Sequence, residues 1–442
     1  MLREIKIENY KSILDDTIEL GRMNVFIGAN GSGKTNILEA LAMVAASKDN
    51  DLNVEGLYNR GVRVTKPSLT FSSFIGSKSR DYIKVSFDID VLEHNKELLN
   101  ILKPESSRLR VSAEFYTEDA NDIYSQWSDK SSEDFEAYLH DVVSSGFVEV
   151  GSLAEDFKMA LDEFRERMKD TGIRNRRDGK SKEAFTRRMN NVLALIESEL
   201  AKGDTITTVK SKIKGELYKD VRDFIIYTLN TQALRGIVSE SKKQPLGING
   251  EGLDILLANF NQAESESIQR YNYLISWLDN LVLDEKDAFK YKGHKLGRST
   301  SILYFKDKFM RKNNNVFSAE NANEGALHIL FYLALFISKK TPQLFAIDNI
   351  ETALNPRVCR TLVKELAQLA KENNKQALIT THNPAILDGL NLNDDEQRLF
   401  VVYRTDEGHT KTKRIKSKPK EGNMKLSELW MRGDLGGLPN DF

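Results

Sequence analysis

A glycine-rich segment near the start of the chain constrains the fold more than any other feature. It spans Gly28 to Thr35, reads GANGSGKT, follows the apolar run Met23 to Ile27 and precedes a helix expected from about Asn36 to Ala46. A loop of this type wraps backbone N–H groups around phosphates at a helix N-terminus, and adds a lysine for the terminal phosphates and a hydroxyl for Mg²⁺. A glycine turn without a ligand is the alternative. The strand, loop and helix order favours a phosphate-binding loop in which Lys34 and Thr35 take those two roles.

Length and composition set the broad class. The 442 residues can bury a large core, and allow either two or three domains or one nucleotide-binding fold with an insertion. A formal net charge of −1 gives no global attraction to nucleic acid or to acidic membranes. The single cysteine, Cys359, excludes an internal disulfide and a cysteine metal cluster, which suits a reducing compartment. No stretch approaches the roughly 20 apolar residues that span a bilayer, so we expect a cytoplasmic protein without a membrane partner.

Hydrophobic periodicity predicts short strands within the first 20 residues and again between residues 83 and 115. Residues Glu4 to Ile7 and Thr17 to Leu20 are expected to be strands, and an alternating pattern from Ile83 to Val91 repeats from Leu109 to Phe115, which predicts an antiparallel pair. From about residue 118 to 220 the composition turns polar and charged. There, Phe157 to Lys169 and Lys182 to Lys202 carry apolar residues at helical spacing, which predicts a short helical hairpin.

The C-terminal part alternates between strand and helix patterns. A turn at residues 247–252 leads into an expected helix from Leu253 to Phe260 and a further helical segment to Leu283. Later strands are expected at 302–305, 343–347, 376–380 and 399–403, and helices at 326–337 and 356–372, which predicts a largely parallel sheet with covering helices. We divide the chain into an N-terminal lobe (1–117), a helical insertion (118–220), a connecting segment (221–300) and a C-terminal lobe (301–442).

A P-loop protein that handles ATP also needs a carboxylate at the end of a neighbouring strand to hold Mg²⁺. Asp348 stands directly after the apolar run Leu344 to Ile347. Taken alone, such an aspartate is usually a turn residue, so its interpretation depends on the motifs around it. The relevant segments are Asn9 to Ser12, Asn323 to Gly325, Asp348 to Pro356 and Ala377 to Pro384.

In this order, these segments resemble motifs of ABC-type ATPases. Asp348 to Pro356 is similar to a Walker B motif with its D-loop, His382 to the switch histidine, and Asn323 to Gly325 to a shortened signature motif. With Asn9 to Ser12 near the start, the pattern resembles the RecF, SMC and OLD branch of that superfamily. The resemblance implies an α/β ABC-ATPase head, with a mixed sheet and covering helices, built from both chain ends and split by a mainly helical insertion.

The resemblance also implies a composite site for ATP and Mg²⁺. Asn323 and Gly325 would cap the γ-phosphate held by the opposite subunit, so a head-to-tail homodimer is the minimum assembly, with a higher homo-oligomer expected. In the same subunit the resemblance assigns nucleotide contacts to Lys11, Asn30, Gly31, Ser32, Gly33, Lys34, Thr35 and Asn36, the metal to Thr35 and Asp348, and catalysis to Asp348, Asn349, Glu351 and His382.

Asn349 departs from the family pattern, because the residue after the Walker B aspartate is usually the glutamate that polarises the attacking water. An amide cannot accept a proton, and general-base help is worth about 10² to 10⁴ in rate. Glu351 could take over if the loop turns it inward; the alternative is that it faces solvent or Arg357. We therefore predict an ATPase with slow turnover. The family's Q-loop glutamine has no counterpart between residues 50 and 100.

Two basic clusters could contact nucleic-acid phosphates, although a charge run is more often a solvated face. The first contains Arg174, Arg176, Arg177, Lys180, Lys182, Arg187 and Arg188, of which the five arginines are the candidate DNA contacts. The second contains Lys411, Lys413, Arg414, Lys416, Lys418 and Lys420.

Within the superfamily the chain is most similar to stand-alone ATPases of bacterial anti-phage defence, in particular the Septu ATPase subunits (PtuA), with PARIS and retron-associated ATPases as near competitors. That resemblance implies a scaffold that restrains an HNH-type or other effector nuclease encoded nearby, since this chain shows no nuclease motif of its own. Two alternatives stay open. One is a RecF-like repair ATPase that clamps DNA on ATP-driven dimerisation, and the other is a purely structural ATP-bound scaffold.

Overall fold

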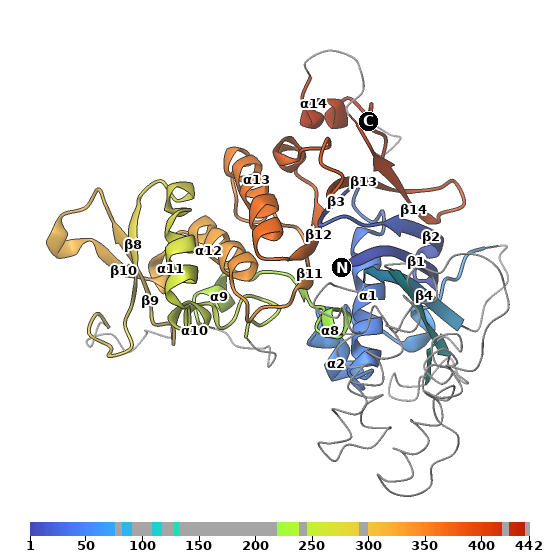
Figure 1. Ribbon diagram of the computed structural model, residues 1–442, viewed down its shortest axis with the longest axis horizontal. Coiled ribbons are helices and arrows are strands. Elements are labelled where there is room, and N and C mark those ends of the chain that lie inside the picture. Colours follow the sequence, from blue (N-terminus) through green and yellow to red (C-terminus); the bar gives the residue numbers. More distant parts are fainter. Residues whose placement is uncertain are drawn as a thin grey trace, which may run out of the picture.

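The computed structural model describes residues 1–75, 82–90, 108–116, 128–131, 219–237, 245–290, 299–417 and 424–437. These residues form three sheets with helices packed on them (Figure 1). No helix among them is long and apolar enough to cross a membrane. The expected helical hairpin and the first basic cluster, which includes Arg174, Arg176, Arg177, Arg187 and Arg188, lie outside the described residues.

The central sheet draws its strands from both ends of the chain. Every neighbouring pair in it is parallel except one edge pair, which confirms the predicted largely parallel sheet. Its order is β14 (Thr410–Ile415), β13 (Gln397–Arg404), β3 (Met23–Ile27), β12 (Gln376–Thr381), β11 (Leu344–Ile347) and β7 (Ile226–Tyr227). The strand that leads into the P-loop therefore lies between two strands from the C-terminal part.

Alternate residues of β3 face two separate cores. Val25 joins the core that holds α12 (Glu324–Ile337) and α13 (Pro356–Glu372), whereas Phe26 joins the core that holds α1 (Lys34–Lys48). In Figure 1, α1 lies on one side of the sheet and α12 and α13 lie on the other. Because both faces are covered, β3, β11 and β12 are buried along their whole length, which explains why their sequences are mostly apolar.

A second, antiparallel sheet packs over α1. Ile83 pairs with Phe115 and Val85 with Ala113, which confirms the predicted antiparallel pair. The order is β2 (Ile13–Glu19), β1 (Leu2–Tyr10), β4 (Tyr82–Asp90), β5 (Arg108–Tyr116) and β6 (Ser128–Ser131). Its inward residues, such as Ile5 and Phe87, share the core of α1, so this sheet and the central sheet enclose the P-loop helix.

The third sheet corrects a prediction. The helical segment expected to reach Leu283 ends earlier, after α10 (Leu253–Ala258) and α11 (Gln262–Gln269), and residues 278–283 form a strand. The sheet order is β10 (Val316–Ser318), β9 (Leu303–Asp307) and β8 (Leu278–Leu283). Leu281 pairs with Phe305, whose ring lies 5.8 Å from that of Trp277, so cross-strand packing overrides the local helical pattern here.

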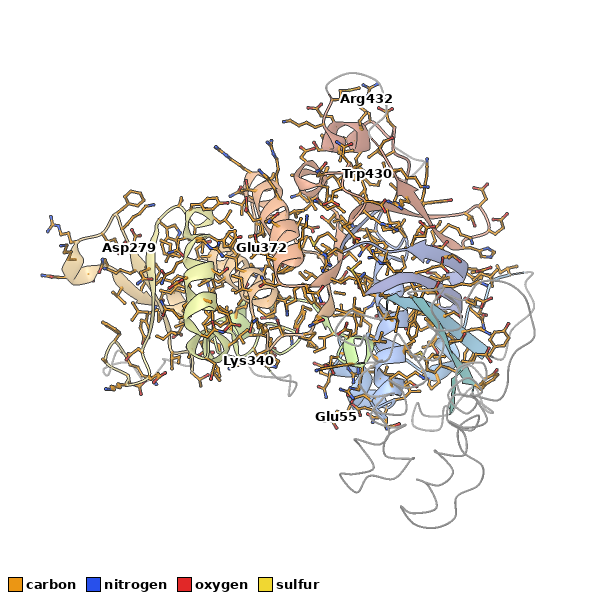
Figure 2. All side chains as sticks on the ribbon, in the orientation of Figure 1. Glu55, Asp279, Lys340, Glu372, Trp430 and Arg432 are labelled. Carbon is orange, nitrogen blue, oxygen red and sulfur yellow. The ribbon has the colours of Figure 1, made fainter. Side chains whose placement is uncertain are left out.

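Short helices complete the described chain. They are α2 (Val54–Tyr58), α8 (Lys219–Arg222), α9 (Thr231–Leu234) and α14 (Leu426–Met431). Trp430 of α14 is 5% exposed and packs into the larger core, while Arg432 directly after the helix is exposed (Figure 2).

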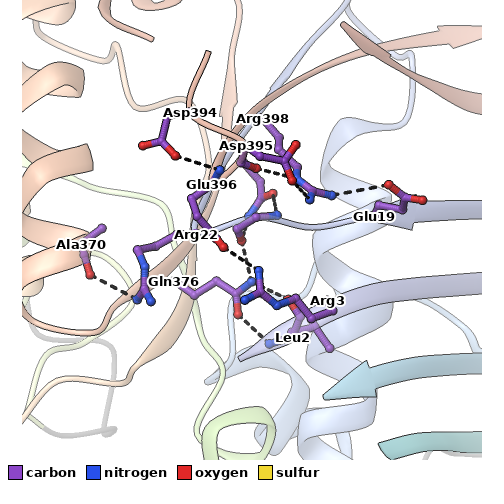
Figure 3. A network of polar contacts seen from close by, with 12 residues as sticks. Leu2, Arg3, Glu19, Arg22, Ala370, Gln376, Asp394, Asp395, Glu396 and Arg398 are labelled. Atoms are coloured by element: carbon purple, nitrogen blue, oxygen red, sulfur yellow. Dashed lines mark hydrogen bonds and ion pairs between the residues drawn. The ribbon is translucent and has the colours of Figure 1, made fainter. Parts of the chain in front are cut away.

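A polar network joins the antiparallel sheet to the central sheet (Figure 3). The side chain of Gln376, at the start of β12, accepts a hydrogen bond from Leu2 N (2.8 Å) and donates to Leu2 O (2.6 Å) and Gly21 O (2.7 Å). Arg3 and Glu396 form an ion pair of 2.7 Å in the same region. This network fixes the N-terminal ends of the strands, at the end of the sheet opposite the P-loop.

Candidate functional site

The P-loop joins the carboxyl end of β3 to the N-terminus of α1, as the sequence predicts. Asn30 and Gly31 are exposed at its tip, and Ser32 is buried with a hydroxyl that has no hydrogen-bond partner among the described residues. The helix begins after Gly33 without a side-chain cap, so its first N–H groups stay available to an anion. This local structure is suited to holding phosphates.

Lys34 points back over the loop. Its Nζ donates to Gly28 O (2.8 Å) and Ala29 O (3.0 Å), and lies 3.5 Å from His382 Nδ1. Burial lowers the pKa of Lys34 to about 8, while the carboxylates of Asp348 and Glu351 act in the opposite direction. The lysine is therefore mostly charged at neutral pH. It lies near His382, Asp348 and Glu351, which the sequence assigns to the same site.

Thr35 and Asp348 lie together at the ends of α1 and β11. The Thr35 hydroxyl is 3.3 and 3.2 Å from the two carboxylate oxygens of Asp348. Thr380, at the end of the neighbouring strand β12, also donates a hydrogen bond to Asp348. Sequence reasoning missed Thr380, although its position in the Thr-Thr-His segment at a strand end was a usable signal.

The Thr35 and Asp348 oxygens fit the donor preference of Mg²⁺, which is held in such sites by one or two carboxylates together with substrate phosphates. Among the described residues no group of three or more His, Cys, Asp or Glu side chains is placed to hold a metal ion. A metal here would therefore complete its coordination with phosphate oxygens and water.

The loop after Asp348 turns Glu351 inward. Glu351 Oε1 accepts a hydrogen bond from His382 N at 2.8 Å. Its second oxygen, Oε2, is buried and has no hydrogen-bond partner among the described residues. Burial and the nearby charge of Lys34 lower the pKa of His382, so its ring is mainly neutral at pH 7. Glu351 thus presents one free carboxylate oxygen beside Lys34 and His382, rather than facing solvent.

Asn349 adopts a left-handed backbone conformation with φ of 55°. Asparagine is among the few residues that tolerate this region, and a side chain branched or longer than that of asparagine costs about 1–2 kcal/mol more. Its N–H donates to Thr380 Oγ1 at 2.9 Å, which links the turn to the partner of Asp348. The backbone geometry therefore accounts for an asparagine here and directs the chain so that Glu351 returns to the site.

Lys11 and Asn36 lie beside the loop in a network of polar contacts. Lys11 Nζ is 2.6 Å from Glu39, a buried carboxylate on α1 that also pairs with Arg63 at 2.8 Å. Asn36 donates to Ser12 Oγ at 2.7 Å and accepts from Arg63 at 3.1 Å. Glu39 and Arg63 were not anticipated, because nothing in their local sequence marks them.

The signature residues lie on the other side of the central sheet from α1. Asn323 is exposed and caps α12, accepting from Ala326 N at 3.3 Å. A Cβ on Gly325 would lie 3.0 Å from Ala353 O, so the glycine allows the D-loop to approach closely. Tyr332, further along α12, donates to Ile350 O at 3.2 Å. The structure thus brings Gly325 to its own D-loop and presents Asn323 outward.

The described part of the second basic cluster lies on β14 and just after it, with acidic neighbours. Arg414 contacts Asp395 and lies 3.4 Å from Glu19, and Lys411 lies 4.0 Å from Asp16. Burial raises the pKa of Asp16 to about 6. These contacts favour a structural role for Lys411 and Arg414.

Comparison with solved structures supports the same fold. Crystal structures of SMC heads align with almost the whole chain: the SmcHead bound to the C-winged helix domain of ScpA has a TM-score of 0.50 at 14% identity, covering 94% of this chain and 98% of that one. The SMC head domain from Thermotoga maritima has a TM-score of 0.44 at 12% identity, covering 94% of this chain and 99% of that one. No curated protein matches the chain. The likeness to the first of these structures confirms the predicted fold of an ABC-type head.

The family comparison covers most of the sequence. Residues 1–387, which include the P-loop, Asp348, Glu351 and His382, match the AAA_15 family, described as an AAA ATPase domain. The chain therefore belongs to this family of ATPases.

Proposed function

We propose that this ATPase binds Mg²⁺-ATP between two head-to-tail copies and hydrolyses it slowly, with nucleotide occupancy controlling a partner. The observation that carries the proposal is the free, buried oxygen of Glu351, placed beside Lys34 and the Thr35 and Asp348 pair. A binding site alone would not need an unpaired carboxylate oxygen at this position, because leaving such a group buried is costly.

The binding roles follow from the loop geometry. Backbone N–H groups of residues 30–33, with the Ser32 hydroxyl, surround the β- and γ-phosphates, and Lys34 neutralises them. Lys34 would exchange its bonds to Gly28 O and Ala29 O for phosphate oxygens. Asn36 and Lys11 border the α-phosphate side. Thr35 and Asp348 would hold Mg²⁺, which supplies charge neutralisation on the phosphates when bound.

Hydrolysis follows from the positions of Glu351 and His382. Glu351 Oε2 accepts a proton from a water molecule as the water oxygen bonds to the γ-phosphorus, and the bond from phosphorus to the β,γ-bridging oxygen breaks to release ADP and phosphate. His382 positions Glu351 through its backbone N–H and lies next to Lys34. Asn349 can orient water but cannot take its proton. We therefore propose slow turnover, with Glu351 acting two residues beyond the usual position of the base.

The second half of the site comes from another copy. Asn323 is exposed at the N-terminus of α12, where the helix dipole and free N–H groups favour an anion. Gly325 keeps the backbone compact at the same end. In a head-to-tail pair these residues would cap the γ-phosphate held by the partner's P-loop, so nucleotide binding and dimerisation are linked.

A mixing experiment tests this arrangement. Lys34→Ala removes the phosphate lysine, and Asn323→Asp keeps a good helix cap but adds a negative charge against the partner's γ-phosphate. Each homo-oligomer should be inactive. Equal co-expression of both variants should restore about a quarter of wild-type ATP turnover in the unselected mixture, because about that share of sites combines an intact P-loop with an intact signature. Heterodimers purified through two different affinity tags should show about half of wild-type turnover, because one of their two sites is intact.

A mixture that remains inactive would contradict the shared site. Asn261→Asp is the matched control, because Asn261 caps α11 in the same way, accepting from Glu264 N at 3.0 Å, and lies on a helix that we assign no role in the site. It should retain wild-type turnover. Loss of activity in this control would show that the change to a cap, rather than charge at the phosphate, inactivates Asn323→Asp.

For the biological role we propose a cytoplasmic regulatory and scaffold subunit of a bacterial anti-phage defence complex that controls an HNH-type or other effector nuclease. The support is the sequence resemblance to Septu-type ATPases, together with the grouping of Lys34, Thr35, Asp348, Glu351 and His382 among the described residues. Phage plating with wild type and Lys34→Ala, each with the neighbouring gene, tests it. Equal phage resistance would contradict the proposal, and turnover stimulated by DNA alone would favour the RecF-like DNA clamp instead.

A further inference from the structure

The hairpin of β13 and β14 holds the back of the P-loop. Arg404 of β13 and Thr410 of β14 face each other in the strand ladder. Arg404 Nε donates to Gly31 O at 3.1 Å, and Thr410 Oγ1 donates to Ser32 O at 2.8 Å. The side chains of one cross-strand pair in the hairpin therefore bind two consecutive carbonyl groups of the loop.

Thr410 is more deeply buried and more closely packed against the loop than Arg404. It is completely buried, and a Cβ on Gly33 would lie 2.2 Å from its Oγ1, so only a glycine lets the loop lie against this threonine. Gly33 also has a φ of 103°, which other residues rarely adopt. The sequence of the loop and the position of the hairpin are thus fitted to each other.

A directed chain of hydrogen bonds fixes the Thr410 hydroxyl. Asn36 Nδ2 can only donate, and it donates to Ser12 Oγ at 2.7 Å. Ser12 then donates to Thr410 Oγ1 at 2.7 Å, which leaves the Thr410 hydrogen for Ser32 O. The Ser12 and Thr410 hydroxyls each accept one hydrogen bond and donate one, so the hydrogen bond from Thr410 to the loop carbonyl has a defined direction.

The two carbonyl contacts determine where the loop N–H groups point. In a planar trans peptide the C=O of one residue and the N–H of the next point in opposite directions. Holding Gly31 O and Ser32 O toward the hairpin therefore turns the N–H groups of Ser32 and Gly33 toward the inside of the loop. Ser32 N does point inward, since it lies 3.2 Å from Ala29 O.

We propose that Arg404 and Thr410 are positioning residues for nucleotide binding, which aim the P-loop amides at the phosphates from behind. This inference rests on the proposed function, because it concerns how the same loop binds ATP. Neither residue touches the nucleotide. The C-terminal hairpin thus sets the affinity of a loop about 370 to 380 residues away in the sequence.

Replacement of Thr410 tests the inference. Thr410→Val keeps the shape but removes the hydroxyl, so the KM for ATP should rise about tenfold while kcat falls less than threefold, as expected when ground-state binding is lost. Thr410→Ser restores the hydroxyl and should return KM to within about twofold of wild type. Arg404→Gln, at an exposed position, should raise KM about threefold without lowering the midpoint of thermal unfolding.

Thr412→Val is the matched control. Thr412 lies on the same strand, but its hydroxyl bonds to Asp16 and not to the loop. Its KM should equal that of wild type. The inference is overturned if Thr410→Val and Arg404→Gln both keep a wild-type KM, or if Thr412→Val raises KM as much as Thr410→Val does.

Lys34→Ala separates this result from failure of the proposed function. If wild type binds no ATP, measured with a fluorescent ATP analogue, the proposed function fails first. If wild type binds ATP, Lys34→Ala does not, and both hairpin variants bind as wild type does, only the positioning role is refuted.

Discussion

Replacing Glu351 by glutamine should separate ATP hydrolysis from ATP binding. The amide can still accept the hydrogen bond that Glu351 Oε1 now takes from His382 N at 2.8 Å. It cannot accept a proton through the other atom, which in the native protein is a buried oxygen without a partner among the described residues. The substitution thus keeps shape and one contact while it removes the proposed base.

The expected loss lies toward the lower end of the usual range for a general base, about 10² to 10⁴ in rate. One oxygen of Glu351 is already engaged by His382 N, so only the other can act. We expect kcat to fall about 100-fold, which corresponds to about 2.7 kcal/mol of transition-state stabilisation. The dissociation constant for ATP should stay within about threefold of wild type, since the lost charge does not contact the phosphates.

Single-turnover phosphate release and equilibrium binding of a fluorescent ATP analogue measure the two quantities separately. Glu396→Gln is a suitable control: Glu396 also uses one oxygen in a 2.7 Å contact, with Arg3, and has a second oxygen that is buried without a partner among the described residues. It lies in the network at the other end of the strands (Figure 3), so its kcat should be unchanged.

Asn349→Glu tests the alternative that the usual position of the base is the important one. The left-handed turn at Asn349 disfavours glutamate by about 1–2 kcal/mol, so this variant should not gain turnover. Our reasoning about Glu351 is wrong if Glu351→Gln keeps more than a third of wild-type kcat, or if Asn349→Glu raises kcat at least tenfold.

Four further outcomes follow from the structure. Burial lowers the pKa of Lys34 from about 10.5 to about 8, so its charged form declines as the pH rises from 7 to 9, and the dissociation constant for ATP should rise about tenfold over that range; a flat profile would contradict it. The unfolded chain holds this proton up to higher pH, so Lys34 should raise the free energy of unfolding between pH 8 and 10, seen as the difference between wild type and Lys34→Met in urea titrations. Gln376→Leu leaves Leu2 N, Leu2 O and Gly21 O without their partner, and should lower the free energy of unfolding by roughly 2–4 kcal/mol; a loss below about 0.5 kcal/mol would show that water replaces these bonds. Tyr332→Phe removes a buried hydrogen bond to Ile350 O and should cost about 1 kcal/mol in the same assay, whereas Tyr403→Phe, at an exposed position, should cost nothing measurable.

The parts of the site that the sequence predicts are those in which a motif directly follows a strand along the sequence. The P-loop, Asp348 and His382 each follow an apolar strand, and the carboxyl ends of neighbouring parallel strands meet at one edge of a sheet. The sequence allows Glu351 to point either into the site or toward solvent, because a turn of a few residues can direct its side chain either way. The left-handed conformation of Asn349 decides between them, and no periodicity reveals a backbone angle.

The parts that the sequence could not show depend on contacts between distant segments. Thr410 meets Ser12 and Ser32 across 398 and 378 residues, and its strand β14 was not predicted. Glu39 looked like an ordinary helix residue until the fold placed Lys11 and Arg63 around it. The strand at 278–283 was wrongly expected to be helical, because its partner β9 begins 20 residues after it ends. Such pairings are properties of the whole fold.

The position of β3 in the central sheet has a consequence for how the protein is made. All five residues of β3 are buried, and the strand pairs with β12 on one side and β13 on the other. At a synthesis rate of roughly 5–20 residues per second, both neighbours leave the ribosome about 20 to 75 s after β3 does. Throughout that interval the nascent chain carries an unpaired apolar strand and an unfinished P-loop. Occupancy of chaperones on the nascent chain should therefore begin near residue 27 and end only once residue 404 has emerged, so the protein cannot hold ATP before β13 has been made.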